Sequence, residues 1–170
     1  VSAPFYEVEI TNKGAAFKSY KLKKYKEKNT VNSPLKQMVP EGMNTVQNKF
    51  SGETITGLNE KFFISDSETD AISVDKENVN VTFVYEESGV IFEKIFQFVP
   101  DSYVIGLTVK IKNLSTYTLK DRLILSLSSG KPTVTSYGFQ GPIALVDNNL
   151  ERIKDFEEKQ VEFNGQFNWI

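Results

Sequence analysis

The stretch VNVTFVYEESGVIFEKIFQFVPDSYVIGLTVKIKN, residues 79–113, contains three consecutive segments in which apolar side chains occupy every second position. Such alternation predicts β-strands with one buried face. The residues predicted to face inward are Val79, Val81, Phe83 and Tyr85 in the first segment, Val90, Phe92, Phe96 and Phe98 in the second, and Tyr103, Ile105, Leu107, Val109 and Ile111 in the third. Lys94 is the exception on its face. Turn-forming residues at 86–89 and 100–102 separate the segments, so we predict an antiparallel meander that the rest of the chain covers.

The third segment has five apolar residues at period two, from Tyr103 to Ile111. Burial of a side chain of this size contributes about 1.5–3 kcal/mol before conformational entropy is subtracted. We therefore expect this strand alone to contribute on the order of 7–15 kcal/mol of gross stabilisation.

Composition restricts the class of protein. The 170 residues, 39% apolar and 25% charged, fit one globular domain over residues 1–170. The net charge of −2 and the pI near 5.4 argue against nucleic-acid binding. The chain has no Cys and no His, which removes disulfides, thiolate metal sites and the commonest general base and zinc ligand. We therefore predict no catalytic residue, no metal and no cofactor, and thus a protein that is not an enzyme.

Membrane and processing signals are absent from the sequence. No stretch approaches the ~20 consecutive apolar residues of a membrane span. Residues 1–4 (VSAP) resemble an internal start, so we expect an excised piece of a longer protein. Asp66, Glu68, Asp70 and Glu77 fall at positions 1, 3, 5 and 12 of a calcium-loop spacing, but Ala71 stands where that loop requires Gly. An acidic surface loop is the better interpretation.

At the beginning of the chain we predict strands over residues 5–11 and 15–25, joined by a tight turn at 12–14. The second strand and its continuation carry six lysines. They are Lys18, Lys21, Lys23, Lys24, Lys26 and Lys28. We interpret them as the solvated side chains of an edge strand, where charge deters pairing with another sheet. Contact with a membrane surface, at about 1 kcal/mol per Lys near anionic lipid, is the alternative.

The remaining segments are also predicted to be strands and loops. We expect a long loop with one helical turn over residues 29–51, short strands at 54–57 and 61–65, and a strand over 119–127. Leu119, Leu123, Leu125 and Leu127 should face inward in the last of these. A broken strand at 137–146, strands within 150–162 and a hairpin turn at 164–165 complete the chain. Ten to thirteen strands with almost no helix predict an all-β, two-sheet antiparallel sandwich.

Three blocks of sequence resemble the large periplasmic domain of bacterial YidC-type membrane protein insertases. The first is YEVEITNKG (6–14) with FKSYKLKKY (17–25). The second is FQF (96–98) leading through DSYVI (101–105) to VKIKN (109–113). The third is GFQGP (138–142), a charged stretch and a closing GQFNW (165–169). Together the blocks span nearly the whole chain in the family's order.

The resemblance implies a β-supersandwich similar in shape to galactose-mutarotase-like sugar-binding and epimerase sandwiches. It implies a domain on the periplasmic face of the bacterial inner membrane, between the first and second membrane helices of an anchored parent protein. In that family the insertion chemistry belongs to the membrane part. This chain departs from the family in stopping at Ile170, before the helices that follow in relatives, and it lacks the catalytic His of the epimerases.

The leading hypothesis is a non-catalytic scaffold domain that contacts accessory subunits of the Sec translocon and client membrane proteins. The domain itself is expected to be monomeric. The resemblance assigns the contact to Phe139, Gly141, Glu151, Arg152, Lys154, Asp155, Glu157 and Glu158. A carbohydrate-binding module or degenerate aldose-epimerase-like domain is the alternative, and an adhesin-like sandwich that assembles by strand addition is a third.

Overall fold

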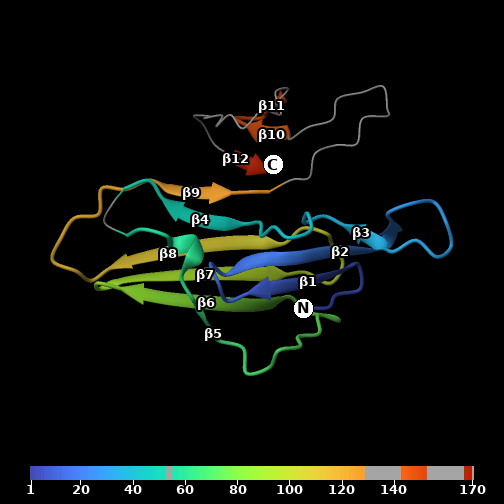
Figure 1. Ribbon diagram of the computed structural model, residues 1–170, viewed down its shortest axis with the longest axis horizontal. Helices are drawn as coiled ribbons and strands as arrows, with labels where there is room; N and C mark the ends of the chain where they lie inside the picture. The colour runs from blue at the N-terminus through green and yellow to red at the C-terminus, as the bar shows by residue number, and fades with distance from the viewer. Residues whose placement is uncertain (53–54, 129–142, 153–166, 170) are drawn as a thin grey trace. The chain divides into compact units, whose positions relative to one another are not determined.

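The computed structural model describes residues 1–52, 55–128, 143–152 and 167–169. They contain twelve strands and one short 3₁₀ helix. Contacts within the chain define two compact units, residues 1–128 and residues 129–170 (Figure 1). Within the described ranges, no helix has the length and apolar character needed to cross a membrane. The single domain expected over residues 1–170 stays a prediction.

The predicted meander forms a four-stranded antiparallel sheet in the first unit. Its strands, in spatial order, are β5 (Ile64–Ser65), β6 (Val79–Glu87), β7 (Val90–Phe98) and β8 (Gly106–Asn113). A two-residue turn joins β6 to β7, with Ser88 at φ 52° and Gly89 at φ 76°. Two positive φ values give a turn whose twist matches that of the flanking strands. The strand order and the alternation of faces confirm the prediction.

The burial of β7 follows the predicted alternation closely. Phe92, Phe96 and Phe98 are at most 1% exposed. Lys94 lies on this same buried face and is 2% exposed. In β8, by contrast, Ile111 is 40% exposed, because β8 is the end strand of this sheet among the residues that the structure describes. The prediction that Ile111 faces inward is therefore wrong, whereas Tyr103, Ile105 and Leu107 are partly buried against the core as expected.

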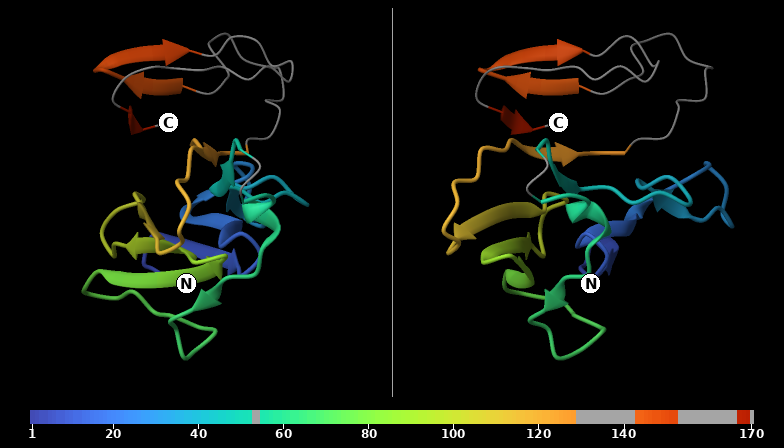
Figure 2. Two further views of the ribbon diagram at one scale, coloured as in Figure 1. Left: turned by 90° about the vertical axis from the view of Figure 1, so that its left-hand side faces the viewer. Right: turned by 60° about the vertical axis from the view of Figure 1, so that its left-hand side comes forward.

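A second sheet packs face to face on the meander (Figure 1 and Figure 2). It consists of β1 (Tyr6–Thr11), β2 (Ala16–Lys26) and β3 (Leu35–Gln37), with β2 in the middle. The rings of Phe17 and Phe96 lie with centroids 4.9 Å apart between the two sheets. The Tyr6 hydroxyl donates to the Val99 carbonyl and accepts from the Val99 N–H, both at 3.1 Å. Aromatic packing and a buried polar anchor thus hold the two layers together.

The lysine-rich strand β2 is not an edge strand. It pairs with β1 along one side and with β3 along the other, where Lys21 is opposite Gln37 and Lys26 is opposite Leu35. The interpretation of its lysines as protection of a free edge is therefore wrong. The reason is that β3, which lies in the segment predicted to be a loop, pairs with β2 and covers this edge.

A two-stranded sheet of β4 (Gln47–Phe50) and β9 (Leu123–Ser126) completes the first unit. The ring of Phe50 packs on Phe92, with centroids 5.3 Å apart. The loop expected over residues 29–51 therefore contains two strands, β3 and β4. Residues 55–57 do not form the expected strand and lead instead into the 3₁₀ helix η1 (Leu58–Glu60).

Three of the four leucines predicted to face inward, in β9 and just after it, do not do so, whereas Leu119 is partly buried against the core. Leu123, Leu125 and Leu127 are 39%, 45% and 46% exposed. Ile124, on the opposite face of the strand, is partly buried. Successive side chains alternate between faces, so the choice of face depends on the sheet that covers the strand and not on the strand's own pattern.

The second unit contains a three-stranded antiparallel sheet. Its strands are β10 (Ile143–Val146), β11 (Asn149–Arg152) and β12 (Phe167–Trp169), in the order β11-β10-β12. The predicted turn at 164–165 lies outside the described residues. The fold class is all-β with antiparallel sheets and little helix, as predicted, and the facing sheets of the first unit form a β-sandwich.

Candidate functional site

Two of the eight predicted partner-contact residues fall in described structure. Glu151 and Arg152 occupy the last two positions of β11 and are exposed. The other six lie outside the described residues. They are Phe139, Gly141, Lys154, Asp155, Glu157 and Glu158.

Strand β11 has the geometry of an accessible sheet edge. It is the end strand of the three described in its unit, and all four of its residues are exposed. Leu150, in the middle of the strand, is 47% exposed. The neighbouring Glu151 and Arg152 point to opposite faces, because side chains alternate along a strand. An edge of this kind offers backbone hydrogen bonds together with apolar and charged side chains to an added strand.

The turn that creates this edge was missed in the sequence. Asp147 and Asn148 join β10 to β11 and have φ values of 48° and 63°. Two consecutive positive φ values form a tight hairpin turn, and Asp and Asn tolerate this conformation better than other non-glycine residues. The stretch VDNNL at 146–150 is the sequence signal for this hairpin turn.

A second surface is formed by residues 18–38, which we call the basic hairpin. It comprises most of β2, the connection 27–34 and β3. It contains seven lysines and one glutamate. Residues 24–32 are all exposed, and the connection projects beyond the strands at the right of Figure 1.

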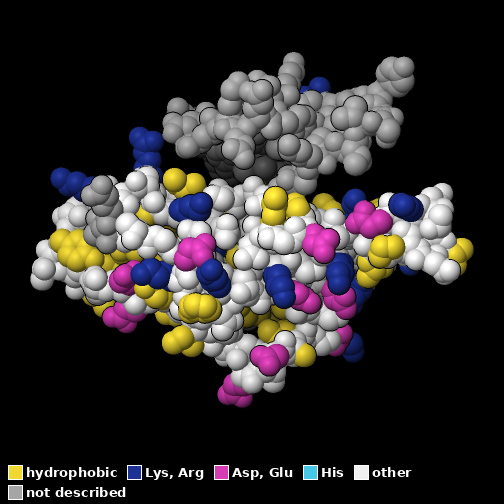
Figure 3. Space-filling view, in the orientation of Figure 1, with side chains coloured by type: hydrophobic (Ala, Val, Ile, Leu, Met, Phe, Trp, Pro, Cys, Tyr) yellow, Lys and Arg dark blue, Asp and Glu magenta, His cyan; other side chains and the backbone are white. Residues whose placement is uncertain are grey.

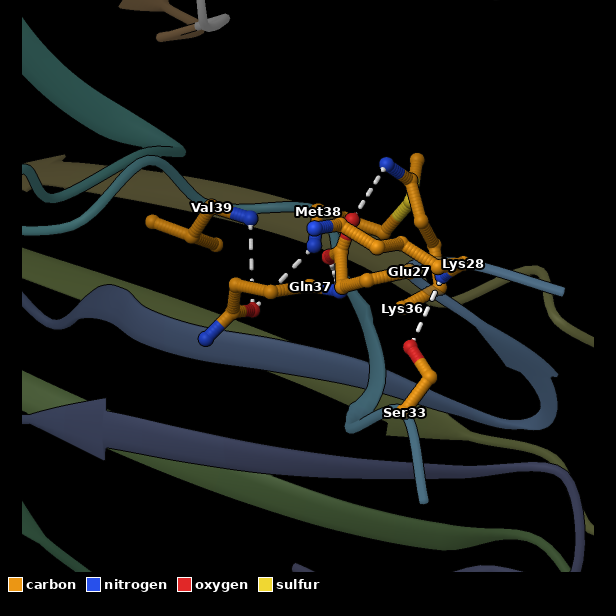
Figure 4. A network of polar contacts seen from close by, with 7 residues as sticks. All are labelled: Glu27, Lys28, Ser33, Lys36, Gln37, Met38 and Val39. Carbon is orange, nitrogen blue, oxygen red and sulfur yellow. Dashed lines mark hydrogen bonds and ion pairs between the residues drawn. The ribbon is translucent and has the colours of Figure 1, made fainter. Parts of the chain in front are cut away.

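Hydrogen bonds order the connection of the basic hairpin. The Glu27 N–H donates to the Pro34 carbonyl at 2.9 Å. The Lys28 N–H donates to the Ser33 hydroxyl at 2.8 Å (Figure 4). Ser33 is itself only 6% exposed. The segment is thus a closed hairpin with a defined tip.

The single carboxylate of the basic hairpin is bound within it. The Gln37 N–H donates to Glu27 at 2.7 Å, and the Lys36 ammonium donates to its other oxygen at 3.0 Å. These two contacts, the first more than the second, lower the pKa of the Glu27 carboxyl. Glu27 therefore stays charged and is neutralised by Lys36.

Lys94 is a buried cation between the sheets of the first unit. Its ammonium donates to the carbonyl of Gly14 at 3.4 Å and to the carbonyl of Val46, and lies 5.3 Å from the ring centre of Phe96. Burial lowers the pKa of this ammonium to about 7. At 2% exposure it is closed to a substrate, so its role here is to bind two backbone carbonyls.

Two open clefts flank the segment 65–72. The larger, about 400 Å³, is lined mainly by apolar and hydroxyl residues, and Asp70 is its one acidic residue among those described. The smaller, about 300 Å³, is lined by Glu7, Glu9 and Lys21 among others. The described residues contain no group of three or more side chains suited to holding a metal ion.

Comparison with known proteins identifies the family. The family model described as the YidC periplasmic domain matches residues 1–170. This chain belongs to the YidC periplasmic domain family. A curated relative, the "Membrane protein insertase YidC" of Syntrophus aciditrophicus (strain SB), is 30% identical over 164 residues, which cover 91% of this chain and 30% of the relative. No solved structure matches the chain.

The YidC match confirms the family predicted from the three sequence blocks. As a YidC periplasmic domain, the chain lies on the periplasmic side of a membrane. It spans 30% of the length of the curated YidC relative. The activity and partners of a whole insertase are therefore proposals for this chain.

Proposed function

We propose that this YidC periplasmic domain is a non-catalytic scaffold and interaction domain of a membrane protein insertase. In this role it assists the insertion and folding of inner-membrane proteins, alone or with the Sec translocon. The observation that carries the proposal is the match of the YidC periplasmic family over residues 1–170. The curated relative, itself named a membrane protein insertase, supports it.

A non-catalytic role is supported by the chemistry that the chain contains. The sequence has no His and no Cys, so proton transfer near neutral pH would depend on side chains with strongly shifted pKa values. Lys94 has such a pKa, but it is sealed in the core by Phe96 and two backbone carbonyls.

We assign the partner contact to the edge formed by β11 and to the neighbouring positions predicted from the family. The partners proposed are accessory subunits of the Sec translocon and client membrane proteins. The exposed strand Asn149–Arg152 supports this choice, because an end strand with an exposed Leu between polar residues can accept an added strand.

The test is a double charge reversal in the full-length protein that carries this chain. Glu151→Lys combined with Arg152→Glu leaves the net charge unchanged and inverts the charge order along β11. We expect it to reduce capture of Sec accessory subunits in a pull-down from solubilised membranes. The matched control is Glu93→Lys with Lys110→Glu, an ion pair of 3.7 Å between β7 and β8. Unchanged capture by the β11 variant, or equal loss in both, removes the assignment.

A further inference from the structure

We propose that the basic hairpin, residues 18–38, binds the surface of an anionic phospholipid bilayer, with Val31 at its tip entering the headgroup layer. This proposal rests on the proposed function, since it requires the domain to lie beside a membrane. It concerns a surface and a ligand different from those of the β11 edge.

The charge distribution of the chain favours this contact. Seven lysines and one glutamate give the hairpin a formal charge of +6 within a chain of net charge −2, which leaves −8 for the rest. A negatively charged surface attracts the hairpin and repels the remainder of the chain, so the field also orients the domain. Each Lys held near anionic lipid contributes about a fivefold increase in binding.

The cations at the tip are available for phosphate groups. Glu27 is already bound by Lys36 at 3.0 Å. Lys26 and Lys28 are exposed and form no ion pair with any described residue. They can therefore approach lipid phosphates without first breaking an internal contact.

Exposed apolar side chains flank these lysines in the sequence. Val31 is 92% exposed and Tyr25 is 55% exposed. Val31 follows Lys28 in the connection, and Tyr25 lies between Lys24 and Lys26. Apolar surface next to lysines is the combination that adsorbs to anionic membranes, and Tyr is favoured at the depth of the headgroups.

The shape and order of the hairpin suit a flat surface. Its connection projects past the strands of the first unit in the right-hand view of Figure 2, and Figure 3 shows Lys and apolar side chains together at this end. The Glu27–Pro34 and Lys28–Ser33 hydrogen bonds hold the tip closed before binding. Less conformational freedom is therefore lost when the hairpin reaches the bilayer.

The proposal is tested by sedimenting residues 1–170 with sucrose-loaded vesicles. One set contains phosphatidylglycerol and phosphatidylethanolamine, and the other contains only neutral phosphatidylcholine. Lys26→Gln with Lys28→Gln should weaken binding to the anionic vesicles by about fivefold for each lysine. Val31→Asp should weaken it by about tenfold. Lys76→Gln with Lys112→Gln, exposed lysines outside the hairpin, makes the same change in net charge and should alter binding less than twofold.

The expected pattern is binding to anionic vesicles that falls with salt and with the hairpin variants. Equal binding to neutral vesicles, equal loss in the control variant, or no binding at all would overturn the proposal. Binding of the hairpin to soluble polyglutamate without binding to vesicles would assign the surface to an acidic protein and overturn it as well. None of these results changes the capture experiment at β11, so the two proposals fail separately.

Discussion

Lys94 is expected to make the stability of the first unit depend on pH. Burial lowers the pKa of its ammonium from 10.5 to about 7 in the folded chain. The unfolded chain then holds this proton more tightly than the folded chain does, so stability rises as the pH increases from about 7 towards 10.5. Below pH 7 Lys94 is protonated in both the folded and the unfolded chain. The folded chain then carries the full free-energy cost of the buried charge.

The size of the effect follows from the shift. A rise of one pH unit increases the free energy of unfolding by at most about 1.36 kcal/mol, and by about half of that when the pH is close to the pKa of Lys94 in the folded chain. Between pH 7 and pH 9 the free energy of unfolding should therefore rise by about 2 kcal/mol. Burial raises the pKa of Tyr20 to about 12, which opposes the trend only above pH 10 and makes pH 9 a suitable upper limit. A neutral amine keeps two N–H donors, so both carbonyl contacts persist after deprotonation.

The assay is urea unfolding of the wild type and of Lys94→Met at both pH values. Methionine removes the titration and also leaves the carbonyls of Gly14 and Val46 without this donor, at a cost of about 1–3 kcal/mol that does not depend on pH. The stability of the wild type relative to the variant should rise by about 2 kcal/mol between pH 7 and pH 9. Equal pH slopes in the two proteins would refute the reasoning.

Three other predictions concern the core, a turn and the alternative carbohydrate ligand. Phe96→Ala should lower the free energy of unfolding by about 3–5 kcal/mol, and Ile111→Ala on the outer strand by under about 1 kcal/mol. A larger loss for Ile111→Ala than for Phe96→Ala in urea unfolding would contradict the burial of Phe96 between the two sheets. Gly14→Ala should cost at least about 1 kcal/mol more than Gly42→Ala, because both have positive φ but only Gly14 places an added Cβ 2.5 Å from the Asn59 carbonyl oxygen. Hexoses should cause no saturable change in fluorescence, and a saturable response would favour the carbohydrate alternative.

The parts of the fold that were predicted correctly depend on neighbouring residues. The alternation within 79–98 identifies the buried faces of β6 and β7, and the Ser88-Gly89 turn follows from local turn chemistry. The first hairpin, β1 with β2, is of the same kind. Period and turn type act over a few residues, so a single sequence contains them.

The features that were predicted wrongly or not at all depend on contacts between distant segments. Lys94 is buried because carbonyls 80 and 48 residues away in sequence bind its ammonium. The exposure of Leu123 and Leu125 depends on the pairing of β9 with β4. Of the candidate site, Glu151 and Arg152 are exposed on β11, and their contact with a partner stays a prediction. The hairpin turn at Asp147, which joins β10 to β11, was not foreseen.

The claim that most needs direct measurement is that this domain acts by binding partners through the β11 edge. Photo-crosslinking in living cells tests it, with a photoreactive residue placed at Glu151 in the full-length protein and, as a control, at the exposed Lys112 on β8. Partner binding through the β11 edge predicts adducts with Sec accessory subunits or client membrane proteins from position 151 and few from position 112. Equal yields from the two positions, or no adduct from position 151, would contradict it.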